Sequence, residues 1–187
     1  MRKLGIFMNV TLNGLYADAN SDMSWAHQSP DDTEWNEFTA ANASGDGALL
    51  FGRVTYDMMA NFWPTPMAQQ MMPTVAEGMN KMPKYVVSRT LDKASWNNTT
   101  VIKGDLAVEI RKLKATPGPD LVTLGSGSIV AQLADANLLD SAQVVIHPIA
   151  LGAGKALFGG IARKLQLKLT KSRTFKNGNV VLWYDPA

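Results

Sequence analysis

The sequence predicts an α/β fold: a mostly parallel, twisted sheet with helices on both faces and an antiparallel hairpin at the carboxyl end. Short apolar runs alternate with amphipathic segments as far as residue 149, an order typical of parallel strands joined by crossover helices. Beyond that point, Leu165, Leu167 and Leu169 alternate with polar residues, which indicates a half-exposed strand. Asn177-Gly178 follows and is a preferred pair for a two-residue hairpin turn.

The individual elements follow from the spacing of apolar residues, which are continuous or alternating in strands and three to four positions apart in helices. We expect strands over residues 4–10, 47–51, 84–88, 99–102, 121–124, 142–149, 165–169 and 180–184. Helices are expected to begin near residues 29, 53, 106 and 128, and part of 67–82 is also expected to be helical. Ser29 is the expected N-cap of the first helix, because Pro30 and two acids follow it. The polar segment 11–28 is expected to be a long loop.

Length and composition set the organisation of the chain. Its 187 residues, 46% of them apolar, suit a single domain over residues 1–187, without a repeat or a linker. The chain has no cysteine, which excludes disulfides, thiolate metal sites and a zinc deaminase motif. No apolar run approaches the roughly 20 residues of a membrane span, and the first residues lack the pattern of a signal peptide. We therefore expect a cytoplasmic protein.

Several function classes are excluded by charge and by the absence of motifs. The formal net charge is +2 and the basic residues are scattered, so we expect no nucleic-acid partner. The sequence around Ser126 does not read Gly-x-Ser-x-Gly, as in serine hydrolases. Gly154-Lys155 lacks the remaining residues of a P-loop. His27 and His147 lie in unrelated contexts, so neither a catalytic triad nor a metal site is expected.

Two glycine-containing turns follow predicted strands and open predicted helices. The first is Gly52-Arg53-Val54-Thr55 and the second is Gly125-Ser126-Gly127-Ser128. Glycine lets a ligand approach the backbone, and the N–H groups at a helix start bind phosphate. Arginine adds a planar cation that can clamp a phosphate. Each turn alone is also compatible with plain turn geometry, but two phosphate cradles after two strands indicate a dinucleotide.

A third segment, Ser88-Arg89-Thr90, closes the predicted strand 84–88 with a cation between two hydroxyls. Such a group is what the 2′-phosphate of NADP requires. A solvated strand end is the alternative interpretation. Arg53 and Arg89 are both expected to face the adenosine 2′-phosphate, because both follow strands whose ends should open on one cleft.

These pieces resemble the dihydrofolate reductase fold, and more closely the reductase (C-terminal) domain of the riboflavin-biosynthesis bifunctional deaminase/reductase and its stand-alone relatives. The matching segments span nearly the whole chain in the right order: VTLNG, LLFGRVTYD, KYVVSRT, LVTLGSGSIVAQLADANLLD and VVIHPIALGAGKALF. The resemblance implies a dihydrofolate reductase-like three-layer α/β/α domain that commonly dimerises. It also implies that NADPH binds across Gly52–Thr55, Ser88-Arg89 and Gly125–Ser128.

The resemblance further implies an NADPH-dependent reductase of a small heterocyclic substrate, similar to 5-amino-6-(5-phosphoribosylamino)uracil reductase. The expected proton donor is Glu34 in the first helix, with Asp32 as the second choice and a bound water molecule as the remaining alternative. Glu34 should lie beside the apolar face of that helix, where partial desolvation suits a general acid.

Four further residues are expected to contact the substrate. Asn13-Gly14 stands where the riboflavin-type reductases usually have Asp-Gly. Trp25 and Trp63 are candidates for stacking on a flat ring. The methionine-rich segment from Met58 to Met82 is either a plastic wall around that ring or adaptable core packing.

Two alternative functions stay open. The first is a dihydrofolate or pteridine reductase, which turnover of dihydrofolate would reveal. The second is a non-catalytic nucleotide- or flavin-binding protein that kept the cofactor cradle and lost turnover. Asn13 in place of the usual acid keeps this second alternative open.

Overall fold

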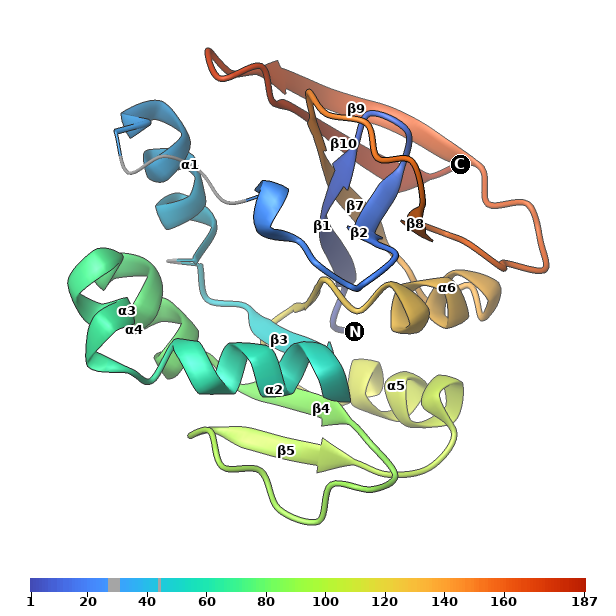
Figure 1. Ribbon diagram of the computed structural model, residues 1–187. Coiled ribbons are helices and arrows are strands. Elements are labelled where there is room, and N and C mark those ends of the chain that lie inside the picture. The colour runs from blue at the N-terminus through green and yellow to red at the C-terminus, as the bar shows by residue number, and fades with distance from the viewer. Residues whose placement is uncertain (27–30, 44) are drawn as a thin grey trace.

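A twisted sheet runs through the centre of the protein in the computed structural model, which describes residues 1–26, 31–43 and 45–187 (Figure 1). The described residues form an eight-stranded sheet of order β5-β4-β3-β6-β1-β7-β10-β9. In this order the strands are Thr99–Ile102, Lys84–Val87, Ala48–Gly52, Leu121–Leu124, Leu4–Thr11, Ser141–His147, Val180–Pro186 and Leu167–Thr174. From β5 to β7 all neighbours are parallel, whereas β10 and β9 are antiparallel. The predicted α/β class is therefore confirmed.

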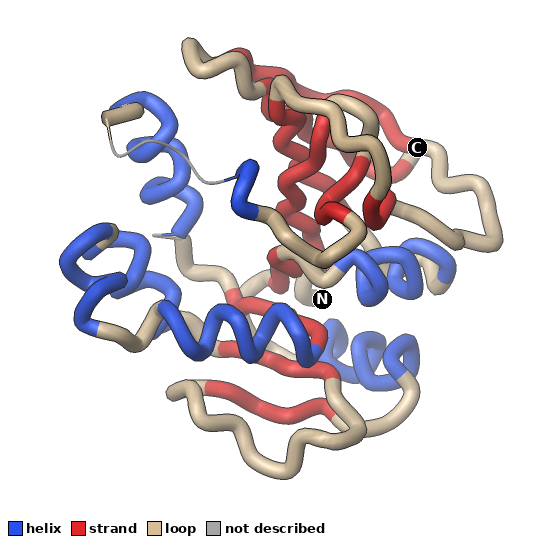
Figure 2. The backbone as a smooth tube through the Cα atoms, in the orientation of Figure 1, coloured by secondary structure: helices blue, strands red, loops and turns tan. Residues whose placement is uncertain are grey.

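Helices cover both faces of the sheet, which gives three layers (Figure 2). On one face, α5 (Leu106–Ala115) and α6 (Gly127–Asp135) pack on alternate residues of β1, such as Ile6 and Met8. On the other face, α1 (Thr33–Ala43) packs on β7 and β10, while α2 (Arg53–Phe62) and α4 (Pro73–Lys81) pack on β3 and β4. The short helix α3 (Pro66–Met71) lies between α2 and α4. Successive side chains of a strand point to opposite faces, so each inner strand contributes to both cores.

The first helix begins later than the sequence predicts. It starts at Thr33, and the Asp32 carboxylate accepts a hydrogen bond from the Trp35 backbone N–H at 3.1 Å. Asp32 is thus the N-cap of α1, whereas the sequence predicted Ser29. Ser29 and His27 lie outside the described residues. Aspartate and serine are about equally good N-caps, so the residue types alone do not show at which of the two positions the helix begins.

Part of the predicted loop 11–28 is a strand. β2 (Leu15–Asp18) pairs antiparallel with β8 (Gly154–Ala156) in a small second sheet beside β1. The 3-10 turn Ser24–Ala26 follows β2. The loop prediction was wrong here because β2 and β8 are short and each is stabilised by a partner far away in sequence.

The carboxyl-terminal hairpin is present, but its turn and its first strand differ from the expectation. The Phe175 N–H donates to the Asn179 carbonyl, so the loop closed by this pair has three residues, 176–178, rather than the two expected. Gly178 has a φ of +87°, as in a three-residue loop with a left-handed last residue. β9 begins at Leu167, and Leu169 is 50% exposed. The predicted alternation of burial is absent because β9 is the edge strand and a bulge interrupts its pairing with β10.

Candidate active site

The two predicted cofactor turns meet at the carboxyl ends of β3 and β6. These strands are parallel neighbours, but α2 leaves β3 toward one face and α6 leaves β6 toward the other. In α/β proteins a divergence of this kind is the usual place of a ligand-binding crevice, and we refer to the junction of Gly52–Thr55 and Gly125–Ser128 as the crevice. The Gly52 N–H donates to the Ser126 hydroxyl at 2.9 Å, so the first residue of one turn is in direct contact with the second residue of the other.

Both helices that open at this crevice lack a side-chain cap. Thr65 and Asp105 cap α3 and α5 by accepting backbone N–H groups of the first turn. Gly52 and Ser126, the N-cap residues of α2 and α6, make no such bond. A helix start without a side-chain cap keeps N–H donors for an anion, which the helix dipole also favours.

The second turn depends on a left-handed backbone. Gly125 and Ser126 have φ values of +61° and +57°, a region that glycine adopts freely and other residues adopt at a cost. A Cβ on Gly125 would also lie 3.4 Å from the Thr55 side chain of the first turn. The hydrogen bond from Gly52 to the Ser126 hydroxyl helps to hold Ser126 in this conformation.

Gly127 is covered by Tyr16, a contact that sequence reasoning missed. A Cβ on Gly127 would lie 2.2 Å from Cε1 of the Tyr16 ring, so only glycine fits under this ring. Tyr16 belongs to β2, and burial raises the pKa of its phenol above the usual value. The small β2–β8 sheet therefore lies against the first turn of α6.

The two predicted phosphate-binding arginines differ in their surroundings. Nε of Arg53 pairs with Oδ2 of Asp57 at 2.6 Å, and both side chains are partly exposed. Arg89 is exposed, and among the described residues nothing bonds to it. Ser88 is buried, and its hydroxyl accepts N–H groups from Thr90 and Leu91. Ser88 thus shapes the turn, while Arg89 presents an uncompensated cation.

The two predicted proton donors face the carboxyl-terminal hairpin instead of the crevice. The Glu34 carboxylate accepts from Nη2 of Arg173 at 3.2 Å and from the Lys176 N–H at 3.3 Å. Besides its capping bond, Asp32 accepts from Nδ2 of Asn177 at 2.6 Å. These partners lie about 140 positions further along the chain than the two acids, so no local sequence pattern predicts the contacts. The catalytic roles of both acids stay predictions.

A polar and aromatic cluster lies at the carboxyl end of β7. Nε2–H of His147 donates to Oδ1 of Asn9 at 2.9 Å. The rings of Trp25 and Trp35 contact the imidazole edge-on, with centroids 5.3 and 6.2 Å away. Burial lowers the pKa of His147 to about 4, so the ring is neutral at physiological pH. The indole N–H of Trp25 is buried without an acceptor in the described chain, which leaves it available to a ligand.

Asn13 and Gly14 shape the loop after β1. The Asn13 amide donates to the Leu151 carbonyl at 2.7 Å and accepts the Leu151 N–H at 3.2 Å. It also accepts the Thr11 hydroxyl. Gly14 has a φ of +80° and its carbonyl accepts the Leu157 N–H. The polar atoms of Asn13 are therefore already engaged, and its predicted contact with the substrate stays untested.

Trp63 lies away from the two turns. It is the C-cap of α2, and its indole N–H donates to the Met59 sulfur at 3.0 Å. A helix rises 1.5 Å per residue, so α2, which separates Gly52 from Trp63, places them roughly 16 Å apart. The spacing along the helix could have shown this from the sequence.

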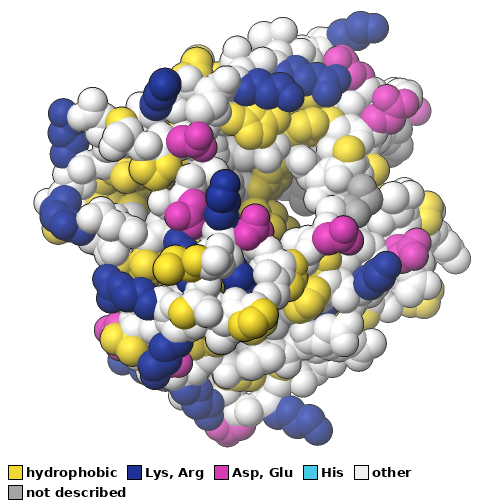
Figure 3. All heavy atoms as spheres, turned by 180° about the vertical axis from the view of Figure 1, so that it is seen from behind, with side chains coloured by type: hydrophobic (Ala, Val, Ile, Leu, Met, Phe, Trp, Pro, Cys, Tyr) yellow, Lys and Arg dark blue, Asp and Glu magenta, His cyan; other side chains and the backbone are white. Residues whose placement is uncertain are grey.

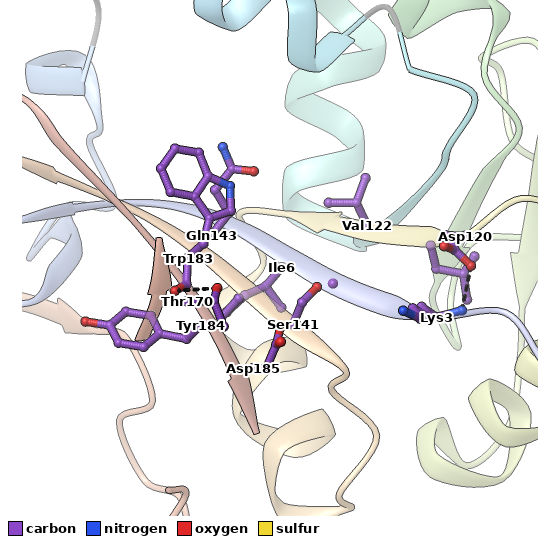
Figure 4. A pocket seen from close by; sticks show the side chains of 13 residues that line it. Lys3, Ile6, Asp120, Val122, Ser141, Gln143, Thr170, Trp183, Tyr184 and Asp185 are labelled. Atoms are coloured by element: carbon purple, nitrogen blue, oxygen red, sulfur yellow. Dashed lines mark hydrogen bonds between the residues drawn. The ribbon is translucent and has the colours of Figure 1, made fainter. Parts of the chain in front are cut away.

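A cavity of about 270 Å³ lies at the opposite, amino ends of β1, β6 and β7. Gln143, Trp183 and Ser141 contribute side chains to it (Figure 4). Seen from behind the view of Figure 1, the molecular surface is hollowed, with hydrophobic side chains in the hollow and charged ones around it (Figure 3). None of the predicted site residues lines this cavity. Within the described ranges, no three His, Asp or Glu side chains are grouped as metal ligands would be.

The chain matches one protein-family model over nearly its whole length. The family model of the RibD C-terminal domain matches residues 2–181. The chain belongs to the RibD C-terminal domain family. Membership supports an oxidoreductase, a reductase of riboflavin-biosynthesis type. Among the helices of the described residues, none has the length and hydropathy to cross a membrane.

Two similar proteins cover almost the whole chain. The uncharacterized Bacillus subtilis (strain 168) protein YyaP is 29% identical over 183 residues, which are 98% of this chain and 94% of YyaP. A Shewanella sp. PV-4 protein, described as a riboflavin biosynthesis protein, is 23% identical with a TM-score of 0.76, and 99% of each chain is covered.

Two more distant structures share the fold. The deaminase/5-amino-6-(5-phosphoribosylamino)uracil reductase of Thermotoga maritima is 16% identical with a TM-score of 0.67, covering 100% of this chain and 57% of that one. Dihydrofolate reductase from Enterococcus faecalis, complexed with NADP(H), is 13% identical with a TM-score of 0.65, covering 98% and 96%. The predicted dihydrofolate reductase-like fold and the resemblance to the riboflavin-type reductases are thus confirmed.

Proposed function

We propose that the protein is an NADPH-dependent reductase of a small heterocyclic substrate, similar to 5-amino-6-(5-phosphoribosylamino)uracil reductase. The observation that carries this proposal is the junction of Gly52 and Ser126, where two helix starts without side-chain caps meet at one crevice. Family membership supports a reductase, and the name of the Thermotoga relative includes this reaction. The dihydrofolate reductase neighbour was solved with NADP(H).

The residues at the crevice fit such a cofactor. The starts of α2 and α6 would bind the pyrophosphate, because their N–H donors have no side-chain cap. Arg89, and Arg53 after release from Asp57, would bind the 2′-phosphate. Val54, the second residue of α2, is 81% exposed and offers apolar surface to a ring. When bound, NADPH supplies the hydride.

The protein groups then orient and enclose the substrate. The neutral His147 ring, with Trp25 and Asn9 against it, forms a wall without charge at the ends of β1 and β7. Glu34 remains our proposed proton donor, with Asp32 second. To act, the Glu34 carboxyl must exchange its contact with Arg173 for one with the substrate or a water molecule.

Cofactor binding and turnover test the proposal separately. Titration of the protein with NADPH and NADH, followed by the quenching of tryptophan fluorescence, should give a lower Kd for NADPH. NADPH consumption should then be detectable with at least one compound from a panel of ribosylaminopyrimidines, pterins and flavins. Failure to bind NADPH would contradict the proposal.

The ion pair of Glu34 with Arg173 favours one competing function, a non-catalytic nucleotide- or flavin-binding protein. NADPH binding without consumption across the whole panel would select it, and turnover of dihydrofolate alone would select a dihydrofolate or pteridine reductase. A single domain over residues 1–187, a homodimer and a cytoplasmic location complete the proposal. Sedimentation of the purified chain tests the dimer.

A further inference from the structure

Asn9 lies at an open edge of the crevice. β1 pairs with β6 only as far as Phe7, opposite Leu124, and the chain leaves β6 at Gly125, whose N–H donates to the Phe7 carbonyl at 3.4 Å. Beyond this point β1 continues to Thr11 and pairs with β7 alone, while β2 packs next to it without pairing. Asn9 therefore lies just beyond the Gly125 turn, where β6 no longer pairs with β1.

The Asn9 side chain is held in one orientation. Its Oδ1 accepts Nε2–H of His147 at 2.9 Å. His147 is 2% exposed and is enclosed by the rings of Trp25 and Trp35. With the amide oxygen as the acceptor, the one proton of the neutral imidazole lies on Nε2, and Nδ2 is the amide group turned away from the ring.

The other end of the amide has no partner in the described chain. Nδ2 of Asn9 makes no hydrogen bond there, and the indole N–H of Trp25 beside the same imidazole is also unpaired. Both groups are neutral donors. The nearby carboxylates of Asp32 and Glu34 are bonded to the carboxyl-terminal hairpin, so they do not supply the acceptor.

We propose that Asn9 is a specificity-determining residue whose Nδ2–H group, positioned by His147, donates to a ring carbonyl oxygen of the substrate. The inference rests on the proposed function, since it places the substrate beside the cofactor turn at Gly125. A ring with an amino group in place of that carbonyl would set donor against donor. A buried donor without an acceptor disfavours such a complex.

Uracil and 2,4-diaminopyrimidine are matched probes for this donor. Both are flat pyrimidines, and they differ in carrying carbonyl oxygens or amino groups at two ring positions. Their Kd values are measured by NMR titration with and without saturating NADPH, using the Trp25 indole N–H signal, which Trp25→Phe assigns. Uracil should bind the natural protein more tightly than 2,4-diaminopyrimidine.

Asn9→Asp replaces the donor with an acceptor of the same shape. We expect the ratio of the two Kd values to shift toward 2,4-diaminopyrimidine by roughly tenfold or more, since a lost and a gained hydrogen bond add. The matched control Asn61→Asp, on the exposed side of α2, should keep the natural ratio. If circular dichroism shows that Asn9→Asp does not fold, Asn9→Ala is used instead. It should weaken the binding of uracil roughly three- to tenfold and leave the Kd of 2,4-diaminopyrimidine unchanged.

An unchanged ratio in Asn9→Asp, or no binding of either probe to the natural protein, overturns the inference. NADPH titration of the same samples keeps the two proposals apart. If NADPH binds but uracil does not, the role of Asn9 is wrong and the proposed function is unaffected. If NADPH does not bind, the proposed function fails, and the titrations without cofactor still decide the role of Asn9.

Discussion

The Gly52 backbone N–H donates to the hydroxyl of Ser126, 74 positions further along the chain. This bond joins the start of α2 to the start of α6. Ser126 holds it from a left-handed conformation with a φ of +57°, which a residue other than glycine adopts only when its surroundings compensate. The hydroxyl therefore has a role that its place in a serine- and glycine-rich turn does not reveal.

Ser126→Ala tests that role. The substitution leaves the Gly52 N–H without its partner, so we expect the free energy of unfolding to fall by about 0.5–1.5 kcal/mol. NADPH should bind roughly three- to tenfold more weakly, because the two helix starts are no longer held together. Urea unfolding and calorimetry measure the two effects. Ser172→Ala, on the exposed strand β9, is the control, and equal NADPH affinity in both variants would contradict the prediction.

Cofactor choice should depend on Arg89. Arg89→Ala removes an unpaired cation, and charged hydrogen bonds contribute about 1.5–3 kcal/mol each. NADPH should therefore lose roughly tenfold or more in affinity, with NADH little changed. Asp57→Asn should have the opposite effect, since it frees Arg53 from its ion pair. Calorimetric titration with both cofactors is the measurement, and equal losses for NADPH and NADH would remove Arg89 from the 2′-phosphate site.

Variants of Glu34 and of its partner Arg173 distinguish a catalytic role of the Glu34 carboxyl from a structural one. Glu34→Gln removes the carboxyl, whereas Arg173→Gln breaks the same ion pair and keeps the carboxyl. If Glu34 donates the proton, turnover should fall by ~10²-fold in the first variant and stay close to the natural value in the second. Steady-state rates across pH decide this. Equal rates in the two variants would mean that Glu34 only anchors the hairpin.

Gly127 should tolerate no side chain while Tyr16 is present. A Cβ there meets the Tyr16 ring at 2.2 Å, so Gly127→Ala should destabilise the protein by about 1–3 kcal/mol. In Gly127→Ala with Tyr16→Ala the two effects should not add, because the residues are in contact. Gly152→Ala is the matched control, since nothing lies within 4 Å of its Cβ position. Additive losses in urea unfolding would refute the contact.

The stability of the fold should decrease in mild acid through His147. Its pKa is lowered from 6.5 to about 4 by burial. Between these values the unfolded chain binds a proton that the folded protein does not, so stability is complete above pH 6.5 and falls toward pH 4. The loss is up to about 3 kcal/mol at 1.36 kcal/mol per pKa unit. Urea unfolding of the natural protein and of His147→Gln from pH 4 to 7 should show a smaller pH dependence in the variant.

The sequence predicts what is local and misses what is distant. The strand-turn-helix units at Gly52 and Gly125 are predicted because glycine, strand and helix start lie within a few residues of one another. The pairing of β2 with β8 is missed because each strand is short and its partner is about 140 positions away. The contact of Glu34 with Arg173 is hidden for the same reason, and it changes the surroundings of the expected proton donor.

The bonds of Asn13 to the backbone of Leu151 use both an amide donor and an amide acceptor. A carboxylate can only accept hydrogen bonds, so Asn13→Asp would lose the bond to the Leu151 carbonyl and keep the one from the Leu151 N–H. The amide joins the loops after β1 and β7, and with them the ends of β2 and β8. Segments fastened in this way open as one cooperative unit. The backbone amides of Leu15 and Leu157 should therefore exchange with solvent deuterium at one common rate, set by the release of a single asparagine.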